Sequence, residues 1–134
     1  MKFQFSKLGL LVPIIIVSFG FSRMIVQDPW PVPEKNAKMA NPMKGDAASL
    51  ATGKSLWAKH CQSCHGKTGK GDGSKSASLK TQPGDFSTAN FQKQTDGEIF
   101  YKTSEGRKDM PSFKKKVPDA DELWSIVNHI RTFK

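Results

Sequence analysis

The feature that most constrains this chain is the segment KHCQSCHG, residues 59–66, which contains both of its cysteines. Two residues separate Cys61 from Cys64, and His65 follows directly. Three chemistries use such a C-x-x-C pair: a redox disulfide, half of a zinc site, and thioether attachment of a haem. A disulfide between these cysteines would close a very short loop, so it would stabilise the fold only weakly.

The N-terminal residues 1–22 are typical of an export signal. Two lysines precede an uncharged apolar run over residues 8–21, and small residues near its end offer cleavage positions. The run is shorter than the roughly 20 residues that a membrane-spanning helix needs. We therefore expect a cleaved signal peptide and an exported protein, with an uncleaved membrane anchor as the alternative.

Residues 23–45 are predicted to form an extended arm or linker. Four prolines lie in this segment, at positions 29, 31, 33 and 42. Proline lacks the backbone N–H that a helix needs and favours extended spacers. Trp30 is the residue that could pin this arm to the surface of the domain that follows.

Residues 46–134 are predicted to form one compact all-α domain. Three helices are expected, over residues 47–60, 96–104 and from about 120 to the C-terminus. Each follows a residue that can cap a helix N-terminus: Asp46, then Thr95 with Glu98 in capping-box spacing, then Asp119 or Asp121. Residues 66–90 are rich in Gly, Ser and Lys, and a loop of this length in a small domain usually has a function.

Two of the three cysteine chemistries fit this organisation poorly. A thioredoxin-like motif lies at the start of a helix that follows a strand, whereas here a helix is expected to run into Cys61 and no strand precedes it. A structural zinc site needs four ligands. Beyond the three residues of the motif, only His60, His129 and carboxylates remain as candidates.

Thioether attachment of haem uses every residue of the motif. The thiols of Cys61 and Cys64 would each bond to one vinyl group, and His65 would be the proximal iron ligand. The planar, apolar cofactor would also supply core to a small chain whose mean hydropathy is only −0.50. The sequence therefore favours one covalently attached haem c.

The chain resembles the class I c-type cytochromes, which are monohaem electron carriers. The resemblance covers residues 46–134 and rests on four motifs: CQSCH (61–65), GKGDG (69–73), GRKDMPSF (106–113) and ELWSIVNHIRTF (122–133). It implies a cytochrome c-like fold in which three to four helices and long loops surround one haem. It also implies that the first and last helices cross beside the haem, where Gly53 and Trp57 would meet Trp124 and Val127.

The resemblance implies that Met110 is the sixth ligand of the iron, opposite His65. The alternatives are that Met110 only fills the core, that Met39 or Met43 of the arm takes its place, or that His129 gives bis-histidine ligation.

The sequence departs from the family pattern at one point near the haem. The family often places a proline soon after the GDG segment, with a nearby carbonyl that accepts a hydrogen bond from the proximal histidine. Here Ser74 stands at that place, and the nearest proline is Pro83. The acceptor for His65 is therefore left open. Lys80, Arg107 and Trp57 are candidate neighbours of the haem propionates.

With His65 and Met110 as ligands the iron would have no open position, and no cluster of catalytic acids, bases or nucleophiles accompanies it. We therefore expect a periplasmic electron carrier of a respiratory chain and not an enzyme. One alternative is a haem-bearing subunit permanently docked in a membrane oxidase or dehydrogenase complex. The other is a peroxidase-type enzyme, which would require Met110 to leave the iron.

The charge of the chain predicts the kind of partner. Lysines and arginines number 21 against 12 acidic residues, for a net charge of +9. Lysines cluster near the two haem motifs, and they either form a solvated face or steer a redox protein with an acidic docking surface, such as an oxidase, reductase or dehydrogenase. These lysines are Lys59, Lys67, Lys70, Lys114, Lys115 and Lys116. A nucleic-acid partner is not expected, because the chain has no stacking pattern and an exported protein meets little nucleic acid.

Overall fold

The computed structural model describes residues 29–134, and in this part the chain is helical and contains no strand. The helices are α1 (Glu34–Ala37), α2 (Ala47–His60), α3 (Gln62–His65), α4 (Ala89–Gln92), α5 (Asp96–Glu105) and α6 (Ala120–Ile130), with a 3₁₀ turn η1 (Ser76–Ser78). The predicted all-α class is confirmed. The predicted export signal and the start of the arm lie outside the described residues. None of the helices within 29–134 is long and apolar enough to cross a membrane.

The three long helices begin where the capping residues predict. Asp46 accepts a hydrogen bond from the backbone N–H of Ser49 at 2.8 Å, which starts α2. Thr95 and Glu98 form a complete capping box at the start of α5, and Asp119 caps α6. Each cap satisfies backbone donors that the first helical turn leaves without partners. The predicted bounds of α2 are confirmed, and α5 is one residue longer than predicted. Helix α6 ends at Ile130, so the prediction that it runs to the C-terminus is wrong.

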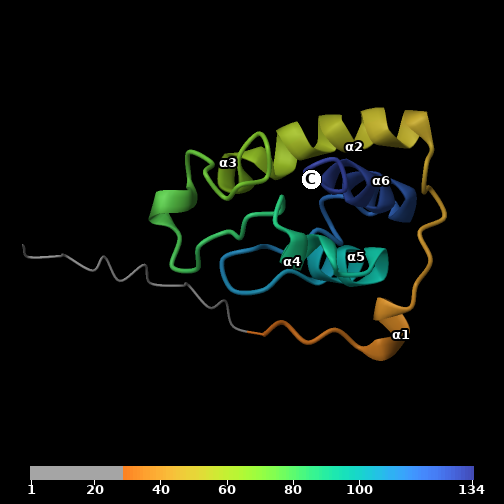
Figure 1. The fold of residues 1–134 in the computed structure, drawn as a ribbon. Helices are drawn as coiled ribbons and strands as arrows, with labels where there is room; N and C mark the ends of the chain where they lie inside the picture. The colour runs from red at the N-terminus through yellow and green to blue at the C-terminus, as the bar shows by residue number, and fades with distance from the viewer. Residues whose placement is uncertain (1–28) are drawn as a thin grey trace, which may run out of the picture.

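Helices α2 and α6 cross in close contact, as Figure 1 shows along the top of the molecule. A Cβ atom on Gly53 would overlap the backbone carbonyl of Ser125, so the two backbones can approach this closely only because the residue is glycine. Beside it, the hydroxyl groups of Ser49 and Ser125 lie 2.9 Å apart in a buried hydrogen bond.

The predicted crossing is therefore present, but the atoms nearest to Gly53 are not those of the predicted residues. The nearest atoms to Gly53 belong to Ser125 and His129, not to Trp124 and Val127. Trp124 instead stacks on Phe100 of α5, with ring centroids 4.1 Å apart. A stripe of apolar residues identifies the face that a helix buries, but not the point along that face where a second helix crosses.

The N-terminal arm is more ordered than predicted. Pro33 stands directly before the short helix α1, where its missing N–H costs no hydrogen bond, so the proline precedes a helix and does not prevent one. The arm then runs along α5 and rises to the start of α2 (Figure 1). The Thr95 hydroxyl donates a hydrogen bond to the carbonyl of Ala37 at 2.6 Å.

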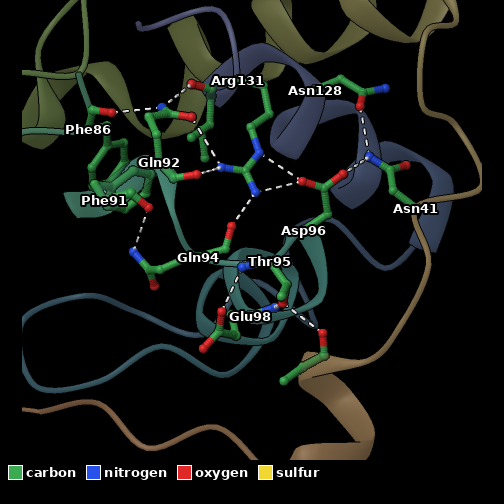
Figure 2. A network of polar contacts seen from close by, with 12 residues as sticks. Asn41, Phe86, Phe91, Gln92, Gln94, Thr95, Asp96, Glu98, Asn128 and Arg131 are labelled. Atoms are coloured by element: carbon green, nitrogen blue, oxygen red, sulfur yellow. Dashed lines mark hydrogen bonds and ion pairs between the residues drawn. The ribbon is translucent and has the colours of Figure 1, made fainter. Parts of the chain in front are cut away.

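A polar network centred on Arg131 joins the end of α6 to α4 and α5 (Figure 2). Its Nε donates to Asp96 at 2.7 Å, and its Nη1 and Nη2 donate to the carbonyls of Gln92 and Gln94 at 3.0 and 2.5 Å. The ion pair between Arg131 and Asp96 is largely buried, with side chains 24% and 17% exposed. A guanidinium so fully hydrogen-bonded fixes the segment around α4 in place.

We predict that Gly53→Ala destabilises the protein although alanine favours helix. The helical preference of alanine over glycine is about 1 kcal/mol. The overlap with Ser125 forces the backbones of α2 and α6 apart, and such overpacking costs about 1–3 kcal/mol or more. Denaturant unfolding of the haem-loaded protein measures the net loss.

The matched control for this prediction is Ser55→Ala, an exposed position on the same helix. It should change the unfolding free energy by less than about 0.5 kcal/mol. A Gly53→Ala protein as stable as the control would show that α2 and α6 are not tightly packed in solution.

Candidate functional site

One cavity of about 580 Å³ gathers the residues that the sequence singled out. Cys61, Cys64, His65 and Met110 all line it. Its volume lies within the range of roughly 300–1,000 Å³ that is usual for small-molecule and cofactor sites. The four residues come from two segments that are distant in the sequence, so the fold, and not their spacing, brings them together.

The two cysteines lie where α2 ends and α3 begins. The backbone N–H groups of Cys64 and His65 donate to the carbonyl of Cys61 at 3.1 and 2.9 Å, which makes this segment one helical turn. Residues three and four apart share one helix face, and this turn therefore presents both thiols and the imidazole to the cavity. Both cysteines are free, and burial, with a smaller contribution from Cys64, raises the pKa of the Cys61 thiol to about 12.

The His65 imidazole is neutral and incompletely satisfied by the protein. Burial lowers its pKa to about 4, so it carries no charge at neutral pH. Its Nδ1 is buried and has no hydrogen-bond partner among residues 29–134. The ring packs against Phe86 and Trp57, with centroids 4.7 and 5.7 Å away. A neutral imidazole can offer one ring nitrogen to a metal, and His65 therefore fits a role as ligand to a bound group.

Trp57 connects the helix α2 to this turn. Its indole N–H donates to the carbonyl of Gly66 at 3.1 Å, directly after His65. Gly66 has a φ of +81°, and a Cβ there would overlap the Asp72 carboxylate. The hydrogen bond and the glycine together fix the chain reversal that follows His65.

Met110 is held by a tight turn over residues 107–110. The backbone N–H of Arg107 donates to the Met110 carbonyl at 2.8 Å, and the Met110 N–H donates back at 3.0 Å. Lys108, inside the turn, has a φ of +54°, which is uncommon for a residue with a side chain. Gly106 precedes the turn with a φ of +69°, and a Cβ there would overlap the backbone around Pro111.

The structure does not bring the alternative ligands to this cavity. Met39 is exposed on the arm, and Met43 packs against the hydrophobic core from outside. His129 lies between Trp57 and Phe133 and lines a separate shallow groove over α2 and α6. Burial first, and then the nearby charge of Lys54, lowers the pKa of His129.

The sequence left open which group accepts a hydrogen bond from His65. Among residues 29–134, Nδ1 of His65 has no hydrogen-bond partner. The Gly71 N–H donates to the His65 carbonyl at 2.9 Å, and a Cβ on Gly71 would overlap the carbonyl of Pro83. Pro83 thus lies in the cavity wall close to this turn. It does not accept a hydrogen bond from Nδ1 of His65.

Sequence reasoning missed most of the cavity wall. The three candidate propionate neighbours Lys80, Arg107 and Trp57 do line the cavity. The residues that were not predicted there are aromatic, aliphatic and cationic: Phe86, Phe91, Ile99, Phe113, Ile126, Ile130, Lys102 and Lys108. Periodicity identifies Ile99, Ile126 and Ile130 as core, but no local signal distinguishes a core residue from one that faces a cofactor.

The residues present fit a haem. The walls are largely apolar and aromatic, as the faces of a macrocycle require, and the half-buried cations Lys102 and Arg107 could pair with its carboxylates. Two thiols and a neutral imidazole lie in the same cavity. No cluster of three or more His, Cys, Asp or Glu side chains that could hold a metal ion by themselves occurs among residues 29–134.

Comparisons with solved structures find the same fold in other proteins. A chain of the reducing HAO-like protein complex Kustc0457/Kustc0458 from Kuenenia stuttgartiensis matches with a TM-score of 0.63 and 23% identity, over 80% of this chain. The match spans 51% of that longer chain. Cytochrome CL from Methylophaga aminisulfidivorans MPT matches with a TM-score of 0.53 and 21% identity, over 68% of this chain and 57% of its own.

A closer relationship in sequence links the chain to the KustC0563 c-type cytochrome. The two are 31% identical with a TM-score of 0.54, over 61% of this chain and 96% of that one. No curated protein matches the chain.

The family model of cytochrome c oxidase, cbb3-type, subunit III matches residues 48–130, which is well over half of the chain. This match confirms the resemblance to c-type cytochromes and, with it, the covalently attached haem c. The predicted cytochrome c-like fold is likewise confirmed. The chain belongs to this family of c-type cytochromes and is an electron-transfer haem protein.

Proposed function

We propose that the protein is a periplasmic carrier that passes single electrons between redox proteins of a respiratory chain. The observation that carries this proposal is the convergence of Cys61, Cys64, His65 and Met110 on one cavity. The bound haem supplies the Fe(II)/Fe(III) couple. Every other contribution to electron transfer comes from the side chains of this protein.

Each of the four residues has a proposed role that its surroundings support. The thiols of Cys61 and Cys64 hold the haem by thioether bonds from one helical turn. His65 offers a neutral imidazole, because burial keeps its pKa at about 4. Met110 offers a thioether, and the turn over residues 107–110 restrains it. With both His65 and Met110 as ligands the iron would have no open position for a substrate, and this supports a carrier over a peroxidase-type enzyme.

A permanently docked subunit is the second candidate. Two observations favour it: the family model describes an oxidase subunit, and one similar structure comes from a protein complex. The segment before the arm would then serve as an anchor, and the protein would remain on the outer face of the cytoplasmic membrane. The carrier and the subunit share the same haem chemistry and differ in whether the partner is exchanged.

We predict that the haem stays attached when the protein is denatured. The mass of the exported protein should exceed that of the processed polypeptide by one haem, and the same spectrum reveals whether residues 1–22 are cleaved. Cys61→Ala or Cys64→Ala should sharply reduce the yield of coloured protein, whereas Ser63→Ala, at the exposed position between them, should not. Pigment that acid-acetone extracts completely from the unmodified protein would disprove thioether attachment.

We predict that Met110→Ala abolishes the weak near-infrared charge-transfer band of sulfur–iron ligation in the oxidised protein. The iron should then bind added imidazole or cyanide, because a coordination position opens. Met39→Ala and Met43→Ala are the matched controls, and both should retain the band. Loss of the band in either control would assign the ligand to the arm.

Partner docking is proposed to depend on positive charge at the cavity rim. Lys80 and Lys108 line the cavity and are exposed. Lys114, Lys115 and Lys116 follow shortly after and are exposed too, although Lys114 is paired with Glu105 at 2.6 Å. Charges so placed would steer an acidic partner towards the haem edge and increase its association rate.

We predict that the double change Lys80→Gln and Lys108→Gln slows electron transfer to the native partner at low salt and flattens its salt dependence. The triple change of Lys114–116 to glutamine should act in the same direction. Screening over a Debye length of about 8 Å at physiological ionic strength removes this advantage. Stopped-flow transfer rates across a salt series provide the measurement.

The control for the charge change is the double substitution Lys54→Gln and Lys93→Gln. It removes the same charge from two exposed sites that do not line the cavity. Rates that depend neither on salt nor on the rim lysines would contradict steering and favour the permanently docked subunit.

A further inference from the structure

The N-terminal arm reaches the cavity from outside the region that the family model matches. That region begins at residue 48, whereas Trp30 of the arm is one of the residues lining the cavity. We propose that Trp30 is a positioning residue for Met110, which it restrains through Arg107. This inference rests on the proposed role of Met110 as the axial ligand.

Trp30 and its neighbour hold Arg107 by two different contacts. The guanidinium carbon of Arg107 lies 4.6 Å from the centroid of the Trp30 ring, within the range of cation–π attraction. Its Nη1 also donates a hydrogen bond to the carbonyl of Pro29 at 2.7 Å. The attraction to the ring face and the directional bond to the backbone together fix the position of this side chain.

Arg107 is in turn one end of the turn that presents Met110. The two residues exchange both of their backbone hydrogen bonds, at 2.8 and 3.0 Å. Between them Lys108 has a φ of +54°, a conformation that costs free energy and persists only where flanking contacts maintain it. Asp109 supplies one such contact by accepting a hydrogen bond from the Thr81 N–H at 2.7 Å. The contact of Arg107 with the Trp30 ring supplies another.

The charges around Trp30 support the same interpretation. The ammonium of Lys102 lies 6.0 Å from the Trp30 centroid, so two cations share this ring. The pKa of Lys102 is lowered mainly by burial, raised by the nearby Glu98 and lowered again by Arg107. Lys102 and Arg107 therefore repel each other, and the electron-rich face of Trp30 offsets that repulsion. Loss of the ring would therefore weaken the hold on Arg107.

The arm itself is docked, and this docking fixes where Trp30 lies. Asn41 donates to Asp96 at 3.2 Å and to Asn128 at 2.8 Å, and Asn128 donates to the carbonyl of Met43 at 2.6 Å (Figure 2 shows Asn41 and its two acceptors). A Cβ atom on Gly97 of α5 would overlap the carbonyl of Asn36. The arm thus lies directly against the α5 backbone, at a distance that only glycine permits.

The test compares how readily added imidazole displaces the Met110 side chain in the oxidised protein. Trp30→Ala should bind imidazole about tenfold more tightly than the unmodified protein, because the loss of a cation–π contact releases the turn. Its near-infrared sulfur–iron band should disappear at a lower temperature than global unfolding. Trp30→Phe retains an aromatic face, so its imidazole affinity should lie close to that of the unmodified protein.

Two further variants make the test independent of any local misfolding at Trp30. Gly97→Ala leaves Trp30, Arg107 and Met110 unchanged but displaces the arm from α5, so it should also tighten imidazole binding. Lys38→Ala is the control, because Lys38 is exposed on the arm and pairs only with the adjacent helical turn through Glu34. It should bind imidazole as the unmodified protein does.

The outcomes separate this inference from the function on which it rests. Trp30→Ala and Gly97→Ala proteins with unchanged imidazole affinity would overturn the positioning role, even if Met110→Ala loses the band. A Met110→Ala protein that keeps the band would instead overturn the ligand assignment itself. Tighter binding in Trp30→Ala that Trp30→Phe does not reverse would also contradict the proposal, since the ring face would not be the cause.

Discussion

The close contact between α2 and α6 is the constraint on which the rest of the structure depends. Because Gly53 carries no side chain, the backbone of α2 lies against the Ser125 carbonyl of α6. One turn further along α2, Trp57 is thereby buried, with 2% of its surface exposed, and its indole N–H reaches the Gly66 carbonyl beside His65. A shift of α2 by the width of a methyl group would move this hydrogen bond and the imidazole with it. The position of the turn that carries Cys61, Cys64 and His65 is therefore set at the helix crossing, about two helical turns away.

The protein interior is incomplete without the cofactor, and this explains the small core. The buried hydrophobic residues gather on α2, α5 and α6 and around Phe113 and Val117, while Phe86, Phe91 and Met110 are only partly buried and border the cavity. When an apolar macrocycle covers the exposed remainder of these side chains, the burial of that surface adds to the stability of the fold. The covalent haem c of this family thus serves the fold as well as electron transfer.

The sequence predicted whatever depends on local chemistry. Asp46, Thr95 and Asp119 mark the helix starts because a side-chain cap involves only the next few residues. The CQSCH segment predicts haem for the same reason, since one helical turn contains both thiols and the imidazole. The short helices α1, α3 and α4 were not predicted, because four residues carry no usable periodicity. The residues nearest to Gly53 are Ser125 and His129, one and two residues beyond the predicted Trp124 and Val127, because the point of crossing depends on packing between helices distant in sequence.

The two sides of the cavity consequently differ in how far their geometry depends on residues that are distant in sequence. The His65 side is built from residues 57–66, so a short motif is enough to identify it and to fix its geometry. The Met110 side has no such local origin. Its turn contains a residue in an unfavourable conformation and is restrained by Thr81 on one side and by Pro29 and Trp30 on the other. The hydrogen bond to Pro29 joins residues 78 apart in sequence, and the bond from Thr81 joins residues 28 apart. Of the two sides of the cavity, the Met110 side is therefore the one that changes in the arm can alter without touching the haem motif.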